Sequence, residues 1–432
     1  MAPGTRDARH REAAEPGQAP RWGAFSYPNY RRFWFASLVR VFGMQFHIFA
    51  AGWLVVAVLD RSPIWLGVVG LSQALPTIVL SVPAGLMADR FEHRRLLVIG
   101  QTLSMINYLA LATLIVTGTV NIWLVIGWAV LAGALSAISN PAQQAILPRL
   151  IEMRAMASAV AFNSAIWNSM RIVGPAVAGV LIAAIGVGQA FFVAGAGFAV
   201  STLLIGTLRL APMPRAGSDG DNSLLGGMRY IFAHRLFLAV VGLSFFSSLF
   251  GMSYQFLMPI FADEVLAVGS SGYGTMGAFA GIGALLGTLS LVKLGATRYR
   301  GQLMIATAAL FGVVVAGFAT STWFALSLGL LFVAGFLSSV YLNLGMTTLQ
   351  VLVPNELRGR VMGVWSMTWF LTSVGGFVVG AGAELVGTPA MVAVGGLAVT
   401  AFAVGLYMIS PELRRLPDLQ PSPRPAPAPT RG

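Results

Sequence analysis

The chain has 432 residues, of which 56% are hydrophobic and only 10% are charged, and its mean hydropathy is +0.78. Soluble globular proteins carry about 25% charged residues, so this composition excludes a water-soluble fold and indicates that lipid surrounds most of the chain. The absence of cysteine excludes disulfides, thiolate nucleophiles and cysteine-based metal sites. The net charge of +12 is attributed to basic loops of a membrane protein and not to nucleic-acid binding.

The predicted elements begin after a polar tail. Residues 1–30 are rich in Pro, Gly and Ala, lack the apolar stretch of a signal peptide, and are expected to form a disordered cytoplasmic tail. A helix that crosses a bilayer needs about 20 predominantly apolar residues. Residues 411–432 are Pro-rich and are expected to form a second cytoplasmic tail. Twelve apolar runs of spanning length lie between the tails, at approximately 33–59, 64–88, 95–117, 121–143, 156–184, 188–209, 236–261, 271–293, 301–319, 322–347, 360–386 and 389–409.

The longest connection between these runs is expected to be a cytoplasmic linker, 211–235, that joins two six-helix bundles, 31–210 and 236–410. Parallel repeats related by an axis along the membrane normal place a substrate site between them. The predicted fold class is therefore an all-α integral membrane protein with twelve transmembrane helices in two pseudo-symmetric six-helix bundles. A shift of 206 residues places loops on loops and spans on spans, and it pairs Pro148 with Pro354, Arg154 with Arg360 and Gly174 with Gly380.

Basic residues are concentrated in alternate connections. With twelve spans both termini lie on one side, and the segments on that side hold every Lys and Arg except Arg40, Arg61 and Arg171. Cytoplasmic loops of membrane proteins are enriched in these residues. We therefore expect a multi-pass protein of the plasma (inner) membrane with both termini in the cytoplasm.

The connection after the second predicted span concentrates charge. The sequence "AGLMADRFEHRR" resembles the loop of the major facilitator superfamily that reads roughly G-x-L-A-D-R-x-G-R-[RK], although Met, Glu and His replace three of its residues. The resemblance implies that Asp89 braces the eleventh span near Arg360 and closes the cytoplasmic side in one conformation. The alternative is an ordinary basic loop in which Asp89 merely ends a helix. The expected switch loop comprises Gly85, Asp89, Arg90, Arg94 and Arg95.

The fifth predicted span contains "NSMRIVGPAVAGVL", with Gly174, Pro175 and Gly179. It resembles the Gly-Pro-x-x-Gly motif of the twelve-helix drug/proton antiporters, and longer runs resemble the exporter branch that contains the enterobactin exporter. The resemblance implies a seal between the two halves. The alternative is ordinary packing, because small residues let membrane helices approach closely.

Among the ionisable residues of the predicted spans, Arg171, Arg40, His47 and Glu384 do not lie at the cytoplasmic end of their span. Arg171 lies about 20 Å deep, where a charge is costly, so it is expected to line the cavity beside the antiporter-like motif or to be satisfied by backbone carbonyls. Arg40 either lines the cavity or extends to the interface. His47 is a candidate for the cavity and for proton coupling, or it is structural. Glu384 is the best carboxylate for proton coupling, or it is a solvated helix end.

The remaining cavity candidates are polar and aromatic side chains at mid-membrane depth. Ligand pockets are mostly apolar with a few placed polar groups, which favours a substrate that is amphipathic. Together with Arg40 and His47, the expected cavity residues are Gln45, Asn163, Tyr254, Gln255, Asn343 and Trp369.

An ATP-driven pump is excluded, because the phosphate loop needs Gly-Lys-Ser/Thr and Leu294 follows the sole lysine, Lys293. The four histidines form no spacing that suits a metal ligand set, so no enzyme activity, metal or cofactor is expected. The leading hypothesis is export of a drug-like amphipathic small molecule in exchange for protons by a monomer in the lipid bilayer. The alternatives are a dedicated exporter of a siderophore or other secreted metabolite, uptake of a small nutrient, and a membrane receptor of the same fold that does not transport.

Overall fold

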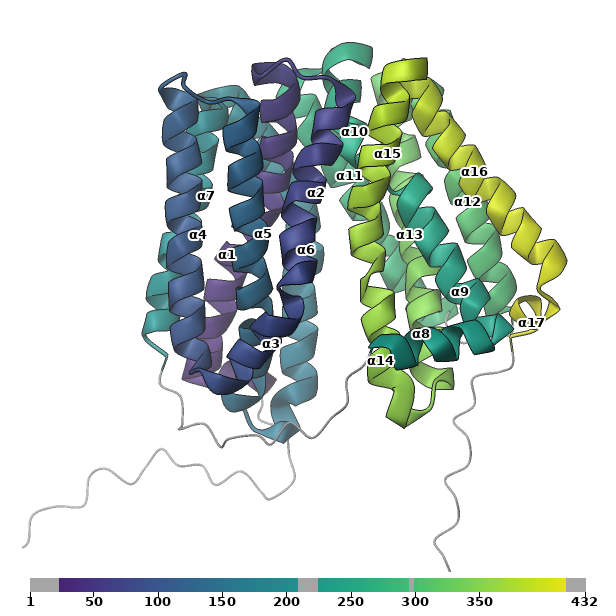
Figure 1. Ribbon diagram of the computed structural model, residues 1–432, viewed down its shortest axis with the longest axis horizontal. Helices are drawn as coiled ribbons and strands as arrows, with labels where there is room; N and C mark the ends of the chain where they lie inside the picture. Colours follow the sequence, from purple (N-terminus) through teal and green to yellow (C-terminus); the bar gives the residue numbers. More distant parts are fainter. Residues whose placement is uncertain (1–22, 209–223, 295–298, 417–432) are drawn as a thin grey trace, which may run out of the picture.

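The computed structural model describes residues 23–208, 224–294 and 299–416 (Figure 1). These ranges are almost entirely helical and contain no strand. The start of helix α1 (Pro28–Trp53) and helix α17 (Pro411–Arg414), near the two ends of the described chain, lie on the same side of the molecule. We call this side the basic side and the other one the opposite side. The side chains outside the description are those of Val82, Leu86, Ala88, Asp89, Arg90, Leu224, Leu225, Val292, Lys293, Leu294, Asn355 and Trp369.

The N half is a bundle of the first six predicted spans. The second span is divided at Leu80 into two helices, and a proline inside the first of them, Pro76, removes a backbone hydrogen bond just before this break. The connections on the basic side include the short turns η3 (Leu147–Arg149) and η4 (Met153–Ala155). The helices of the N half are α1 (Pro28–Trp53), α2 (Pro63–Val79), α3 (Ser81–Arg90), α4 (His93–Val116), α5 (Ile122–Ile146), α6 (Met156–Ile185) and α7 (Val187–Gly206).

The C half repeats this arrangement, and the twelve predicted spans are confirmed to within a few residues. Within the described ranges, eleven helices are long and apolar enough to cross a membrane, and the second span is carried by the shorter apolar helix α2 continued by α3. The eleventh span is divided at Met367. The helices of the C half are α9 (Arg235–Phe246), α10 (Tyr254–Ile260), α11 (Gly269–Leu294), α12 (Arg300–Thr320), α13 (Phe324–Leu352), α14 (Asn355–Ser366), α15 (Thr368–Val386) and α16 (Thr388–Ile409).

Both predicted tails are too long. At the N-terminus, η1 (Gly23–Ser26) and the start of α1 are anchored to α6, because the Ala24 amide donates to Ser158 Oγ over 2.6 Å and the Tyr30 hydroxyl donates to the Ala159 carbonyl over 3.1 Å. At the C-terminus, α17 (Pro411–Arg414) buries Leu413 completely. The rest of the two tails, 1–22 and 417–432, lies outside the described residues.

The predicted linker also contains an ordered helix, α8 (Leu224–Ala233), whereas its first part, 209–223, lies outside the described residues. Helix α8 runs across the spans on the basic side and packs against α14 (Figure 1). The contact is between backbones, because a Cβ on Gly227 would lie 2.6 Å from the Arg360 carbonyl oxygen. The linker is therefore attached to the basic end of the eleventh span.

The first span of each half ends in a π-helical turn, η2 (Leu54–Val58) and η6 (Phe261–Val265). In each, a backbone amide bonds to the carbonyl five residues earlier. A residue with positive φ follows in both halves, Asp60 at 48° and Ala267 at 50°, a conformation that is uncommon outside glycine. A third π-helical turn, η5 (Ser247–Gly251), lies between α9 and α10 and has no counterpart in the N half among the described residues.

The repeat is real, but a constant shift of 206 residues is wrong for Gly174. Gly186 and Gly387 precede the last helix of each half with φ of 85° and 87°, and they are 201 residues apart. The spacing of the two halves is therefore not constant along the chain, since α4 is longer than α12 whereas α5 is shorter than α13. Counted from these glycines, Gly174 corresponds to Gly375 and Gly179 corresponds to Gly380.

Candidate transport interface

The N and C halves meet along two seams. In the first, α6 of the N half packs against α11 of the C half. A Cβ on Gly179 would lie 2.6 Å from the Ser270 carbonyl oxygen, and a Cβ on Gly274 would lie 2.5 Å from the Pro175 carbonyl oxygen. Real Cβ atoms do not approach other atoms so closely, so this α6–α11 seam admits only glycine at these positions.

The second seam joins α2 to α15. A Cβ on Gly380 would lie 2.8 Å from the Pro63 carbonyl oxygen, and one on Gly67 would lie 2.5 Å from the Phe377 amide nitrogen. Gly67 and Gly274 are equivalent positions of the repeat, as are Gly179 and Gly380. The α2–α15 seam is therefore the pseudo-symmetric copy of the α6–α11 seam.

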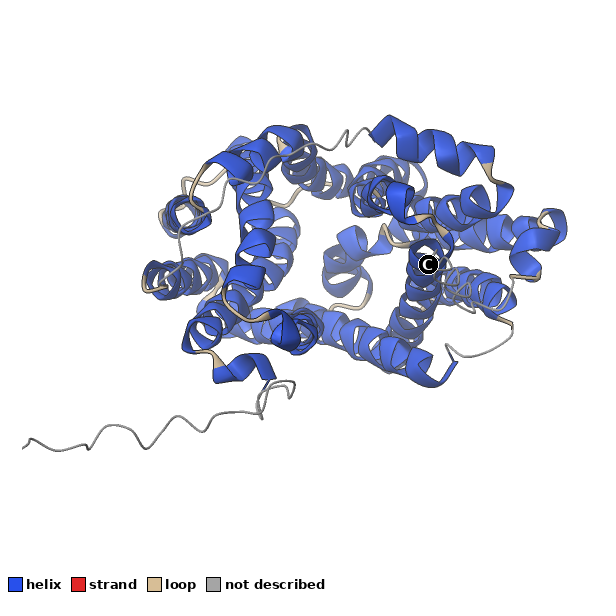
Figure 2. Ribbon diagram, turned by 90° about the horizontal axis from the view of Figure 1, so that it is seen from below, coloured by secondary structure: helices blue, strands red, loops and turns tan. Residues whose placement is uncertain are grey.

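Both seams lie in the half of the molecule that is distant from the basic side. They use the first part of α2 and α11 and the last part of α6 and α15, all of which adjoin the opposite side. Among the described residues, no extensive contact joins α3, α4 or α5 to α8, α9 or α14. The bundles separate toward α3 and α14, and the view from the basic side looks between them (Figures 1 and 2). Among the described residues, the extensive contacts between the two halves therefore lie toward the opposite side.

A side-chain hydrogen bond crosses the outer end of the α2–α15 seam. The Ser62 hydroxyl, just before α2, donates to Glu384 Oε1 over 2.5 Å, and both groups are exposed. Glu384, the carboxylate predicted to couple protons, therefore lies at the opposite side of the molecule and contacts the other half. We call this pair the Ser62–Glu384 latch.

Arg171 lies at the inner end of the α6–α11 seam. Its backbone contacts α11, because a Cβ on Gly281 would lie 2.6 Å from the Arg171 carbonyl oxygen. Its side chain is partly buried and interacts electrostatically with Tyr254 of the C half. Within the described part of the chain, its guanidinium forms no ion pair or hydrogen bond, and the Asn168 amide donates to Ser164 of its own helix instead.

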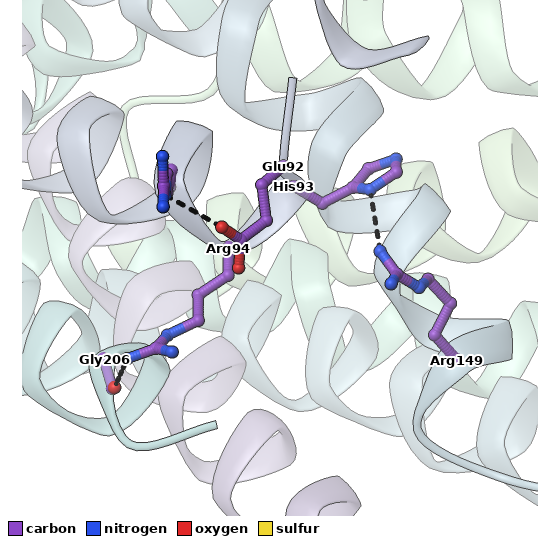
Figure 3. A network of polar contacts seen from close by, with 6 residues as sticks. Glu92, His93, Arg94, Arg149 and Gly206 are labelled. Carbon is purple, nitrogen blue, oxygen red and sulfur yellow. Dashed lines mark hydrogen bonds and ion pairs between the residues drawn. The ribbon is translucent and has the colours of Figure 1, made fainter. Parts of the chain in front are cut away.

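The charged loop forms contacts within the N half (Figure 3). Arg95 pairs with Glu92 at 2.9 Å, and His93 Nδ1 lies 3.3 Å from Arg149 Nη1. Arg94 donates to the Gly206 carbonyl at the end of α7. Asp89 and Arg90 are the last residues of α3, which packs on α5, and their side chains lie outside the description.

His47 lies in the core of the N half and not on the interface. Its Nδ1 is 2.7 Å from the Tyr108 hydroxyl, and its Nε2 is 3.2 Å from Gln73 Nε2. Trp128 packs edge-on against the imidazole, with ring centroids 5.5 Å apart. Four helices, α1, α2, α4 and α5, thus enclose this His47 network, which makes a substrate contact by His47 incompatible with the present conformation.

Comparison with known proteins assigns the family. A family model described as transmembrane secretion effector, within the major facilitator superfamily, matches residues 19–430. The chain belongs to this family. It is a multi-pass major facilitator transporter, as the charged loop indicated.

Curated relatives of the transporter include the staphyloferrin A transporter of Staphylococcus aureus, which is 26% identical over 398 residues, covering 86% of this chain and 96% of the relative. The enterobactin exporter EntS of Escherichia coli O139:H28 is 25% identical over 344 residues, covering 78% of this chain and 81% of the relative. Both names describe transporters, and the second describes an exporter.

Solved structures share the fold. A variant of the nucleoside transporter NupG aligns with a TM-score of 0.71 at 14% identity, covering 88% of this chain and 99% of that one. The D-xylose–proton symporter aligns with a TM-score of 0.67 at 14% identity, covering 91% and 99%. At this identity the likeness concerns the fold alone.

The other expected site residues of the transporter are dispersed. Arg40 is buried rather than extended to the basic side, and its Nε has no hydrogen-bond partner among the described residues. Asn343 donates to the Ser339 carbonyl over 2.7 Å inside the C half. The Gln45 side chain packs against Gly174 within the N half. Asn163 is half-buried on α6, and Gln255 is exposed beside buried Tyr254. A Cβ on Gly85 would meet no described atom within 4 Å. The side chain of Trp369 is not among the described ones.

Sequence reasoning missed the partners of several of these residues. Ser62, Gln73 and Tyr108 contact predicted residues through hydrogen bonds, and Gly274 and Gly67 complete the seams. The sequence offered one sign of such a partner, the polar Gln73 in the apolar run "GVVGLSQALPTIVL". An amide inside the protein requires a hydrogen-bond partner.

Proposed function

We propose that this transporter exports a secreted, anionic metabolite of the siderophore class by alternating access. Two relatives are named for staphyloferrin A and for enterobactin, which favours the dedicated exporter over the drug-like exporter that the motif suggested. Chelators of hard metal ions present oxygen donors, and such donors are commonly anionic. Arg171 is the observation that carries the proposal, since it offers a planar donor group at the interface of the halves.

The proposed orientation places the basic side in the cytoplasm. The support is the distribution of Lys and Arg, of which only Arg40, Arg61 and Arg171 fall outside the segments on that side. In this orientation the two seams close the outside and the halves are apart on the cytoplasmic side. The structure then corresponds to the state that receives substrate from the cytoplasm.

The proposed cycle begins when an anionic group of the substrate enters between the halves and pairs with Arg171. A guanidinium matches a carboxylate through two parallel hydrogen bonds. The seams and the Ser62–Glu384 latch then part, and the cytoplasmic ends approach. In that second state we propose that Asp89 braces the eleventh span, which agrees with the lack of extensive contact between the described parts of α3 and α14 in the present state.

Proton coupling is proposed to act through Glu384. A hydroxyl donates more strongly to a carboxylate than to a neutral carboxyl group. Protonation of Glu384 from outside therefore weakens the latch and favours opening of the α2–α15 seam. For net exchange with the substrate, this proton has to leave toward the cytoplasm once the seam closes, and the latch then forms again with the carboxylate.

Transport into inside-out vesicles tests the proposed function. With a tricarboxylate chelator as substrate, Arg171→Gln is expected to reduce the initial rate at least tenfold, because the variant loses its charge-assisted bonds. Arg171→Lys should retain part of the rate, since it keeps the charge but loses the planar donor pair. Arg61→Gln, on the outer loop, is the matched control. Normal transport by Arg171→Gln, or the absence of gradient-dependent flux in the native protein, would contradict the proposal.

A further inference from the structure

An open cavity of about 580 Å³ lies on the basic side of the N half. It is formed where α1 and α4 begin and where α7 ends, so it lies at the boundary between the spans and the aqueous phase. Segment 209–223, which follows, lies outside the described residues and is no part of this site. The cavity is lined by Arg32, Arg94, Leu204, Gly206, Thr207 and Leu208.

Two guanidinium groups converge on this cavity from different helices. Arg32 Nη1 donates to the Thr207 carbonyl over 3.3 Å, and Arg94 donates to the Gly206 carbonyl. These carbonyls at the end of α7 attract cations, but a guanidinium has five N–H donors and each side chain uses only one in these bonds. Among the described residues that line the cavity there is no acidic side chain. Two positive charges thus share a space with no described counter-charge.

The equivalent place in the C half is filled. There α17 packs against α9, α12 and α16, which correspond to α1, α4 and α7. Leu413 is fully buried, and a Cβ on Gly301 at the start of α12 would lie 3.0 Å from Leu416 Cδ1. The fold therefore does not require a cavity here. The N half alone combines an open space with two arginines.

We propose that this cavity binds the phosphate group of an anionic lipid headgroup. Basic pockets between membrane helices on the cytoplasmic side bind anionic headgroups, and the arginine fork matches the geometry of phosphate oxygens. Leu204 and Leu208 supply an apolar wall beside the two charges, as the junction of a headgroup and its acyl chains requires. The inference goes beyond the proposed function and does not depend on the substrate.

Lipid binding to the full-length protein tests the proposal. In neutral detergent, native mass spectrometry should detect phosphatidylglycerol retained in preference to phosphatidylcholine. Arg32→Gln and Arg94→Gln should each weaken retention about fivefold, and the double variant about 25-fold, since a basic residue at the surface contributes about 1 kcal/mol. Arg31→Gln is the matched control, because Arg31 is an exposed neighbour on α1 that does not line the cavity.

Two further experiments test whether the bound phosphate belongs to a lipid or to a soluble compound, and whether a variant loses lipid because it is misfolded. Glycerol phosphate and inorganic phosphate at millimolar concentration should not displace the lipid, because the acyl chains contribute to binding; displacement would overturn the lipid assignment in favour of a soluble phosphate. The Arg32→Lys/Arg94→Lys double variant should retain more lipid than the Gln pair at an unchanged melting temperature. Equal loss with Arg31→Gln, or equal retention of both lipids, would overturn the site.

Discussion

The two seams use equivalent glycines of the repeat but differ in their polar groups. The α2–α15 seam ends at the outer rim in a hydroxyl–carboxylate hydrogen bond between Ser62 and Glu384. The α6–α11 seam ends toward the middle of the protein at Arg171, a fixed charge near Tyr254. The pseudo-symmetry thus gives two equivalent helix pairs whose backbones pack directly against each other. We propose that the groups added to them allow one closure to respond to protonation of Glu384 and the other to respond to an anionic substrate.

The largest expected effect comes from widening one seam. Gly179→Val places a branched side chain where a Cβ already meets the Ser270 carbonyl oxygen at 2.6 Å, so the α6–α11 seam cannot close. We expect transport to fall at least 100-fold and the outer face to become permanently accessible to a membrane-impermeant cysteine reagent at an introduced Cys. Gly127→Val is the matched control, because a Cβ on Gly127 meets nothing within 4 Å. Retained transport in Gly179→Val would show that the seam does not have to close this tightly.

Asp89→Asn tests whether the basic side has a closure of its own. If Asp89 braces the eleventh span in the second state, loss of its charge removes an interaction with a helix N-terminus, where negative charge is stabilising. Transport should decrease roughly tenfold, while the amount of protein in the membrane is unchanged. Glu92→Gln, which removes the neighbouring carboxylate that pairs with Arg95, serves as the control. Equal rates in Asp89→Asn and the native protein would leave the two seams as the sole closures.

Glu384→Gln is expected to have a smaller effect that depends on pH. The variant cannot exchange a proton, so its transport rate should vary little with external pH, whereas the native rate should rise as protonation weakens the latch. Ser62→Ala removes the same hydrogen bond without removing the carboxylate. It should accelerate opening several-fold and remove the pH dependence that acts through the latch. An unchanged pH profile in Glu384→Gln would assign proton coupling to another group.

Tyr108→Phe is expected to have the smallest effect on transport. It removes the hydrogen bond to His47 inside the N half, and hydrogen bonds between membrane helices contribute about 0.6 kcal/mol on average. We expect a slightly lower melting temperature and a native pH profile of transport. Loss of pH dependence in Tyr108→Phe would instead indicate that the His47 network carries the proton.

The sequence was sufficient for the spans because their length and apolar composition are local properties. It could not predict the order of 23–30, since those residues are held by bonds to Ser158 and Ala159, more than 120 positions away. The ten-residue α8 is too short for a spanning signal, and it is positioned by its packing on α14.

For the candidate site, the sequence predicted which residues matter better than it predicted which residues they contact. The depth of Arg171 indicated a functional charge, and Gly179 indicated close packing, but the glycines opposite them depend on how the two halves dock. His47 has the depth of a cavity residue and yet lies inside the N half. Depth gives the position along a helix and leaves its rotation about the axis undetermined, so the side of α1 that carries His47 could not be inferred.

The paired π-helical turns, η2 and η6, bear on the origin of the molecule. Each ends the first span of its half, and each is followed by a non-glycine residue with positive φ, Asp60 or Ala267. A π-helical turn arises from one inserted residue in an α-helix and is rare. Its presence at equivalent places indicates that the insertion existed in an ancestral six-helix unit before gene duplication. The filled site beneath α17 and the additional turn η5 are then differences that arose between the two copies after the halves diverged.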